Sequence, residues 1–379
     1  MSETQKHTKP NVPNLRFPGF DEEWRKTHLS QMGDIIGGGT PDTTIAEYWN
    51  GNILWFTPSE VGKEKYVSDS NRKISLEGLK NSSAKILPKQ SILLSSRATV
   101  GECSINLKEC CTNQGFQSFI PNNSVVSTEF LYYRLLTHKR DFIRKACGST
   151  FLEISARQIA KISSYLPEKK EQDKIASLLS LIDKRISIQS KVIEDLKKLK
   201  TALCEKFLVQ ISNSPLAELR KHCSITTGKL DANAMSESGK YMFFTCAKEN
   251  YRTDTYAFEG DALLISGNGE LGLCKYYSGK FNAYQRTYVL QNFDMDIQFA
   301  KLMIDSFLPR KIYREKNVGA MPYIVLSTLS ELQIPVPDCE IQTRISTVLN
   351  TFANKIELEE CVLTKLILMK NHILSQMFI

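Results

Sequence analysis

Residues 171–208 read EQDKIASLLSLIDKRISIQSKVIEDLKKLKTALCEKFL, and residues 342–379 read QTRISTVLNTFANKIELEECVLTKLILMKNHILSQMFI. The second stretch repeats the first at an offset of 170 residues. The residues that recur at this offset are Gln172, Ile175, Leu179, Ile186, Val192, Leu196 and Lys200, which return as Gln342, Ile345, Leu349, Ile356, Val362, Leu366 and Lys370. A repeat of this length indicates two tandem units rather than one continuous core.

Each copy carries apolar residues at alternating steps of four and three. This period of 3.5 residues predicts a long helix with a narrow apolar seam, which needs a partner helix to shield it from water. Polar residues fall at the same steps of both copies, Gln189 with Glu359 and Lys200 with Lys370, and such residues tend to fix the register of a seam. The predicted seam positions are Ile175, Leu179, Ile182, Ile186, Ile193, Leu196, Leu203 and Phe207 in the first copy, and Ile345, Leu349, Phe352, Ile356, Leu363, Leu366, Ile373 and Met377 in the second. The other copy is the expected partner, and the alternative is that each helix packs on its own domain.

The helices divide the chain into four predicted parts: a globular domain over 1–165, a spacer helix over 166–212, a second globular domain over 213–338 and a second helix over 339–379. A helix over residues 171–208 would span roughly 55 Å, which is a spacer's length. In front of the helices, short apolar runs alternate with turn residues, a pattern typical of strands. The expected fold class is α+β, with two tandem mixed α/β domains that are each followed by a long helix.

A weaker repeat, at an offset of 171 residues, relates the two globular domains to each other. Its anchors are Gly101 with Gly272, Cys103 with Cys274, Gln114 with Gln285, and Gly148 with Gly319. Outside these anchors the domains differ widely. Two related scaffolds with divergent loops favour a protein that presents two different surfaces on one frame, because loops change without loss of the core.

The composition is that of a soluble globular protein, with 42% hydrophobic and 24% charged residues. Forty-nine Lys and Arg against 41 Asp and Glu give a formal charge of +8, which favours a polyanionic partner. The polar N-terminus lacks the apolar core of a signal peptide, and no long apolar run follows, so we expect a cytoplasmic protein with no membrane partner. The ten cysteines are scattered without a Cys-x-x-Cys pair, which predicts reduced thiols and no metal site.

Several short motifs occur in order along the chain: the opening Asn14–Phe20 with Trp24, the run Gly33–Pro41, the turn Gly148–Thr150 and the stretch from Leu166 to Ile175. Together they resemble the specificity subunits of type I restriction-modification enzymes. The resemblance covers essentially the whole chain. It implies that the domains over 1–165 and 213–338 are target-recognition domains, each reading one half of a split site in double-stranded DNA. It also implies that the helices pair as an antiparallel coiled coil that acts as a ruler for the unread gap.

The same resemblance implies a non-catalytic subunit to which methyltransferase (M) subunits dock and which restriction (R) subunits then join. Cofactors are expected on those partners, as S-adenosylmethionine, ATP and Mg²⁺, with none bound by this chain. The sequence has no G-x-x-x-x-G-K-[ST] phosphate loop and no Asn-Pro-Pro-aromatic methyltransferase motif, in keeping with that division of labour. The rival hypothesis is a coiled-coil structural adaptor with globular protein-binding domains, which the salt dependence of DNA binding would distinguish.

Bases in the major groove are read by planar donors and acceptors at loop tips or helix ends, with Arg suited to guanine and Asn or Gln to adenine. The DNA-binding candidates are Thr40, Arg97, Thr99, Gln114, Gln117, Ser149 and Thr150 in the first domain, and Lys229, Asn268, Gln285, Arg286, Tyr288 and Tyr323 in the second. Arg97 and Arg286 are the strongest, and the alternative for each candidate is an ordinary loop residue. Arg310, Lys311 and Arg314 fit phosphate contacts or a solvated helix face.

One dinucleotide-like pattern needs a separate interpretation. Gly267–Gly272 matches G-x-G-x-x-G after an apolar run, but the residues that follow do not start an obvious helix. A phosphate site of this kind needs the free amides and dipole of a helix N-terminus. The pattern is therefore predicted to be a turn between two strands.

Overall fold

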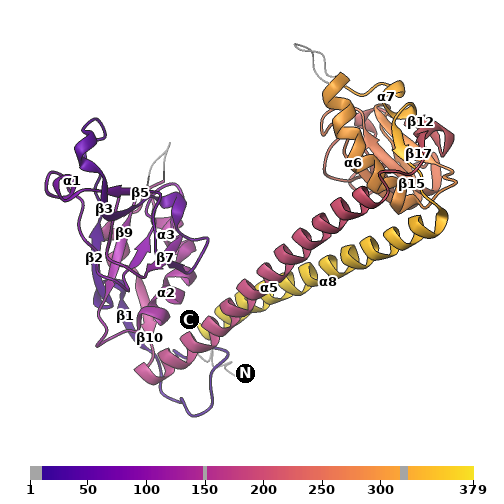
Figure 1. Cartoon of the computed structure of the whole chain (residues 1–379). Helices are drawn as coiled ribbons and strands as arrows, with labels where there is room; N and C mark the ends of the chain where they lie inside the picture. Colours follow the sequence, from indigo (N-terminus) through magenta and orange to yellow (C-terminus); the bar gives the residue numbers. More distant parts are fainter. Residues whose placement is uncertain (1–10, 148–151, 316–322) are drawn as a thin grey trace, which may run out of the picture. The chain divides into compact units, whose positions relative to one another are not determined.

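The computed structural model describes residues 11–147, 152–315 and 323–379. The chain divides into two compact units, of which the first runs to Ile188 and includes Leu363–Ile379, while the second is Gln189–Val362. Two long helices, α5 (Lys169–Gln210) and α8 (Cys339–Met377), contribute to both units (Figure 1). Each unit therefore joins one globular domain to one end of each long helix.

The described part of the first unit is built on a five-stranded sheet with the strand order β2-β9-β6-β7-β4. Its strands are β2 (Gly33–Gly37), β9 (Gln117–Pro121), β6 (Ile92–Leu94), β7 (Cys103–Asn106) and β4 (Tyr66–Val67). Ile92 and Leu94 face a core shared with helix α2 (Thr128–Thr137), whereas Leu93 faces a second cluster against β3 (Trp49–Phe56). The run is continuously apolar because both faces of the strand are covered.

Smaller elements complete the domain of the first unit. The strand β3 is the centre of a three-stranded sheet with β5 (Arg72–Ile74) and β8 (Cys110–Thr112), and β1 (Arg25–His28) pairs antiparallel with β10 (Ser163–Leu166). The short helices are α1 (Leu76–Lys80), α3 (Lys139–Lys145) and α4 (Ala156–Ala160). The strand β10 leads into α5 after Pro167, so this antiparallel strand pair lies where the domain meets the helix.

The described part of the second unit holds a six-stranded sheet with the order β12-β17-β15-β16-β13-β14. Its strands are β12 (Ser224–Thr227), β17 (Thr287–Gln291), β15 (Phe258–Ser266), β16 (Cys274–Ala283), β13 (Tyr241–Phe244) and β14 (Tyr251–Thr253). Leu263 and Ile265 face the core formed with α6 (Ile297–Glu315), while Ala262 and Leu264 face a second apolar cluster. The remaining elements are β11 (Leu216–Glu218), which pairs with β18 (Gln333–Pro335), and the short helix α7 (Leu326–Ser330).

The two domains share one plan, which confirms the predicted fold class of tandem mixed α/β domains. The order β2-β9-β6-β7 recurs as β12-β17-β15-β16, and the antiparallel pair β1·β10 recurs as β11·β18. The recurrence extends to single contacts. Gln172 donates to Pro167 O (3.0 Å) and accepts from the Ser127 amide (2.9 Å), while Gln342 donates to Pro337 O (2.9 Å) and accepts from the Asp296 amide (3.3 Å).

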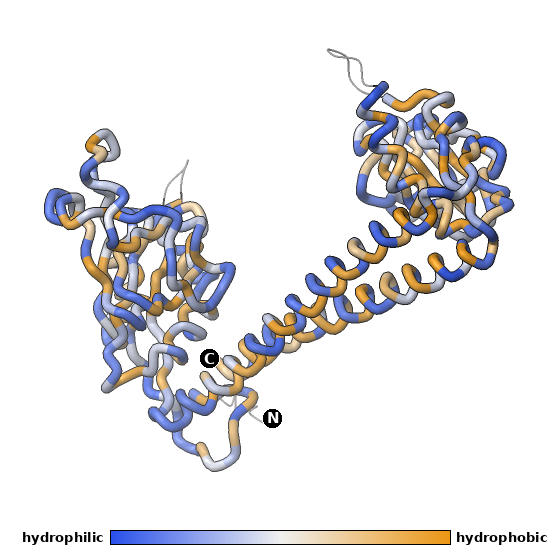
Figure 2. Tube along the Cα trace, in the orientation of Figure 1, coloured by the Kyte–Doolittle hydropathy of each residue, from blue (hydrophilic) through white to orange (hydrophobic). Residues whose placement is uncertain are grey.

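The prediction of two long helices is confirmed, with bounds that differ slightly from the heptad pattern. The helix α5 begins at Lys169 because the amides of Glu171 and Gln172 already bond to the carbonyl of Glu168, at 3.1 and 3.0 Å. All sixteen predicted seam positions are buried or half-buried. Hydrophilic and hydrophobic residues alternate along both helices, as expected for a seam on one side only (Figure 2).

Both ends of each helix pack into a domain core. In the first unit, Ile175 and Leu179 of α5 share a core with Met377 of α8, and in the second, Phe207 of α5 shares one with Ile345 of α8. The alternative that each helix packs only on its own domain is therefore not what the units show. The predicted coiled-coil pairing along the whole length of the helices stays a prediction.

Candidate nucleic-acid interface

The turn between two central strands has the same backbone in both domains. In the first, the amide of Ser95 bonds to Glu102 O (2.8 Å) and that of Gly101 to Ser95 O (3.0 Å). In the second, Ser266 bonds to Leu273 O (3.0 Å) and Gly272 to Ser266 O (2.8 Å). The pattern Gly267–Gly272 thus lies between the antiparallel strands β15 and β16, as the sequence predicted, and does not open a helix.

Left-handed backbone positions recur in these turns as well. Ala98 (φ 57°) and Gly101 (φ 87°) in the first domain correspond to Gly269 (φ 61°) and Gly272 (φ 77°) in the second. Only glycine adopts such angles without strain, so Ala98 carries a small conformational cost. The turn presents the segment 97–99 in one domain and 268–270 in the other.

A second segment lies beside each turn, held by one backbone hydrogen bond that occurs in both domains. The Ser96 amide bonds to Gly115 O (2.8 Å) and the Gly267 amide to Arg286 O (2.9 Å). A third segment joins on the other side, since the Ile154 amide bonds to Ser96 O (3.1 Å). The Ile324 amide makes the same bond to Gly267 O (2.8 Å), so three chain segments meet at one edge of each domain.

The candidates of the first domain gather at this edge. Arg97 forms an ion pair with Glu153 (2.8 Å), and both side chains are about two-fifths exposed, at 42% and 40%. Thr40 donates a hydrogen bond to the side chain of Gln114, and Thr99 donates to Ser95 Oγ (3.0 Å). Gln117 stands opposite Gly37 in the β2·β9 ladder. Ser149 and Thr150 lie outside the described residues, as do the repeat anchors Gly148 and Gly319.

The candidates of the second domain divide into exposed and engaged side chains. Lys229, Gln285 and Arg286 are exposed, and the Gln285 amide bonds to Leu230 O (3.0 Å), which brings residues 229–230 beside the edge. Tyr288 donates its hydroxyl to Ile324 O (2.9 Å), and burial raises the pKa of that hydroxyl. Tyr288 therefore holds the third segment in place, whereas Tyr323 next to that segment is 65% exposed.

The structure also shows which candidates correspond. Through the shared hydrogen bonds, the counterpart of Arg97 is Asn268, which is half-buried, and the counterpart of Arg286 is Gly115. The two arginines thus stand on different segments of the edge. The frame is the same in both domains, but the donors and acceptors that it presents are different.

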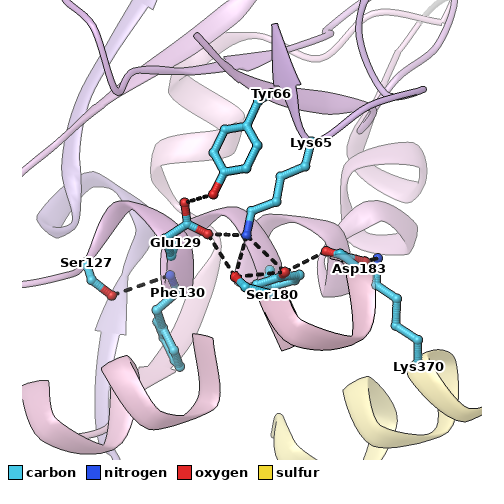
Figure 3. A network of polar contacts seen from close by, with 9 residues as sticks. Lys65, Tyr66, Ser127, Glu129, Phe130, Ser180, Asp183 and Lys370 are labelled. Carbon is cyan, nitrogen blue, oxygen red and sulfur yellow. Dashed lines mark hydrogen bonds and ion pairs between the residues drawn. The ribbon is translucent and has the colours of Figure 1, made fainter. Parts of the chain in front are cut away.

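A polar network, which the sequence did not indicate, fastens the first domain to the helices within the first unit (Figure 3). The Lys65 ammonium, just before β4, donates to Ser180 Oγ on α5 (2.7 Å) and to Tyr133 Oη on α2 (3.0 Å), and it pairs with Glu129. Burial lowers the pKa of Lys65, although Glu129 opposes that effect.

Two further contacts extend this network to the second long helix. Tyr133 donates its hydroxyl to Asp183 of α5 (2.6 Å), and Asp183 pairs with Lys370 of α8 (2.5 Å). A seam lysine at position 370 was visible in the heptads, but its partner was not. The distant residues Lys65 and Glu129 carry no periodic signal that could have joined them to the helices.

The described ranges also lack two other kinds of feature. Among these residues, no group of three or more His, Cys, Asp and Glu side chains is arranged to hold a metal ion. None of the described helices is long and apolar enough to cross a membrane.

Tandem α/β domains carry the same edge geometry with different side chains, and each domain is joined to both long helices, which defines a duplicated two-domain architecture. Residues 21–198 and 214–367 match the family model described as the type I restriction modification DNA specificity domain. The chain belongs to this family.

The chain is similar to several known members of this class. It is 36% identical over 192 residues to the MjaIX specificity subunit of Methanocaldococcus jannaschii, covering 50% of this chain and 44% of that protein. It therefore spans less than half the length of that relative. Its similarity to the EcoprrI specificity subunit of Escherichia coli is 23% identity over 376 residues, covering 88% of each chain. Its fold is similar to that of a type I restriction-modification S subunit from M. genitalium, with a TM-score of 0.65 at 18% identity over 97% of this chain and 99% of that one.

Proposed function

We propose that this chain is the DNA-recognition subunit of a type I restriction-modification complex. Each domain uses the edge described above to read one half of a two-part site in double-stranded DNA. The observation that carries the proposal is the repeated three-segment edge, because one frame with two sets of side chains suits two different base sequences. The chain itself performs no catalysis in this proposal. The partner subunits bind the cofactors S-adenosylmethionine, ATP and Mg²⁺.

The candidate base-reading residues of the first edge are Thr40, Arg97, Thr99, Gln114 and Gln117, to which Ser149 and Thr150 are added from the sequence. Those of the second edge are Lys229, Asn268, Gln285, Arg286, Tyr288 and Tyr323. Arg pairs in bidentate fashion with guanine and Asn or Gln with adenine. The excess of positive charge supports binding to DNA phosphates, which adds affinity without sequence selection.

The long helices have a separate role in the proposal. They pair as an antiparallel coiled coil, set the distance between the two reading edges and carry the methyltransferase subunits, which the restriction subunits join. Support comes from the sheltered seam positions and from contacts between α5 and α8 inside each unit, such as Asp183 with Lys370 and Gln189 with Glu359 O (3.1 Å). We expect the complex in the cytoplasm, where the chromosome is accessible.

Selection from a library of randomised DNA duplexes tests this function. The full chain, alone and co-expressed with a type I methyltransferase subunit, should enrich a motif of two defined blocks separated by an unread gap. The affinity should fall steeply with salt, since each neutralised phosphate contributes about −0.9 to the slope of log K against log salt. Binding with no sequence preference and no salt dependence would favour the adaptor hypothesis instead.

A substitution at Arg97 tests the assignment of the first edge. Arg97→Ala should relax the preference at one position of one block by about 1–3 kcal/mol and leave the other block unchanged, because a bidentate base contact is lost. The matched control is Arg25→Ala at an exposed position of β1, outside the three segments of the edge, which should leave both blocks as they are. An unchanged motif with Arg97→Ala would remove Arg97 from the reading surface.

A further inference from the structure

Ser104 and Lys275 hold equivalent places, one residue after the repeated cysteines Cys103 and Cys274. Their side chains differ in length and charge, yet both hold the loop that follows an equivalent strand, since β3 pairs parallel with β8 at Cys110 and β13 pairs parallel with β16 at Phe281. The Ser104 hydroxyl accepts from the Gly62 amide (3.0 Å) and donates to Glu64 O (2.6 Å). The two loops are residues 57–65 and residues 245–250.

Lys275 makes more hydrogen bonds to the second loop than Ser104 makes to the first. The Lys275 ammonium donates to Ala247 O (3.0 Å), Lys248 O (2.8 Å) and Asn250 Oδ1 (2.8 Å), and Glu249 O lies at 3.4 Å. An ammonium has three donors and no acceptor, so it suits a cluster of carbonyl oxygens. Residues 246–250 belong to no strand or helix, and the ammonium is a shared partner for several of their oxygens.

Both loops touch the predicted reading edge. In the first domain, Thr99 Oγ1 lies 3.4 Å from Pro58 O, so residues 57–65 lie against the turn that carries Arg97. In the second domain, the Glu270 amide bonds to Cys246 O (3.0 Å), and the Cys246 thiol donates to Arg286 O (3.3 Å). The loops thus form a fourth segment at each edge.

The side chains at the loop tips are exposed and differ between the domains. The first loop exposes Ser59, Lys63 and Glu64, and the second exposes Lys248, Glu249 and Asn250. The scaffold position 104/275 is therefore a place where a single residue sets the shape of a neighbouring variable loop. Its identity must match the loop, since a hydroxyl bridges one amide and one carbonyl, whereas an ammonium gathers several oxygens.

We propose that the loop 245–250 is a specificity-determining part of the second reading edge and that Lys275 is the residue that positions it. Ser104 has the same role for residues 57–65 in the first domain. This inference rests on the proposed function and extends the reading surface to residues that the repeat comparison did not reveal.

Selection from randomised duplexes with the full chain and its co-expressed methyltransferase tests the inference. Lys275→Met keeps the aliphatic stem and removes the ammonium. It should change the base preference at one or more positions of a single block by at least tenfold and leave the other block intact. Lys275→Arg should restore part of the original preference. The matched control is Lys280→Met, because Lys280 lies exposed on the same strand but contacts Tyr256 (3.4 Å) instead of the loop.

A second variant keeps the test decisive if Lys275→Met does not fold. Lys248→Ala with Glu249→Ala alters the loop tip but preserves the backbone oxygens that Lys275 holds. It should change the same block as Lys275→Met, while Ser104→Ala should change the other block. If the wild type selects a motif of two blocks and the loop-tip variant leaves both blocks unchanged, the inference is overturned. A wild-type chain that selects no motif would instead overturn the proposed function.

Discussion

Ala98 and Gly269 occupy the same left-handed turn position in the two domains. The Cβ of Ala98 makes this backbone conformation less stable than it is for Gly269. The sequence repeat identified Gly101 and Gly272 as anchors, but it could not show that Ala98 shares their backbone region, because alanine gives no sign of a positive φ. The candidate Arg97 was found from its residue type and Gln114 also from its place as a repeat anchor, and the structure brings both to one edge. Lys275 and Ser104 were missed because the repeat conserves their place and not their chemistry.

Exchanging the residues at this turn position should change stability in opposite directions. Ala98→Gly should raise the free energy of unfolding of the first unit by about 0.5–1 kcal/mol, since it relieves a left-handed alanine. Gly269→Ala should lower that of the second unit by about 1 kcal/mol or more, because the new Cβ would be strained and would lie 3.0 Å from Cys246 O. Urea unfolding measures both values, and a loss of stability with Ala98→Gly would contradict this reasoning.

His138 predicts a pH dependence of stability. Burial, followed by the nearby Arg134, lowers the pKa of His138 from 6.5 to about 4, although Asp141 opposes the shift. The folded chain therefore keeps this imidazole neutral while the unfolded chain takes up a proton. Its contribution to stability is complete above pH 6.5 and is lost as the pH falls from 6.5 towards 4.

The difference between wild type and His138→Gln isolates this contribution. Between pH 7.5 and 5.5, the wild type should lose about 1 kcal/mol more free energy of unfolding than the variant. Denaturant unfolding at both pH values measures this difference. An equal loss in the two proteins would show that His138 titrates normally in the folded chain.

The long helices were the most predictable elements, because a 3.5-residue apolar period extends over their whole length. The bounds followed from local contacts, such as the Glu168 carbonyl that begins α5 at Lys169. The strand order of the sheets was not predictable, since short apolar runs such as Ile92–Leu94 indicate a strand but not its neighbours. The network around Lys65 was equally hidden, because it joins residues that are far apart in sequence.

Two leucines on α5 test the seam. Leu179 is fully buried and Leu181 is 67% exposed, although they are only two residues apart. Leu179→Ala should lower the free energy of unfolding of the first unit by about 2–5 kcal/mol, while Leu181→Ala should change it by at most about 0.5 kcal/mol. Thermal or urea unfolding compares them, and similar losses at both positions would contradict the predicted seam.

The duplicated architecture joins each of the two proposed reading edges to both long helices. The sequence predicted the tandem arrangement from its offset repeats, and the shared hydrogen bonds at the edges and at Gln172 and Gln342 extend that repeat to atomic contacts. Which bases each edge reads could not be predicted, since that depends on how the edge docks in the groove. In the proposal, the paired helices set the distance between the two edges. That distance should therefore increase with the number of residues in the helices.

Lengthening both helices tests the ruler. Insertion of one matched heptad into α5 and α8 adds about 10.5 Å, which corresponds to at most about 3 base pairs of duplex. The unread gap of the selected motif should increase while the two blocks keep their sequences. A heptad added to α5 alone is the control and should abolish selective binding, because the seam loses its register. An unchanged gap with matched insertions would contradict the ruler.

Sequencing of methylated bases in a host that expresses this chain with its methyltransferase tests the central claim most directly. The account predicts one motif of two defined blocks with a fixed unread gap, in which Arg97→Ala alters one block and Arg286→Ala the other. A single continuous block, or two blocks that both change with either substitution, would contradict recognition by two independent edges.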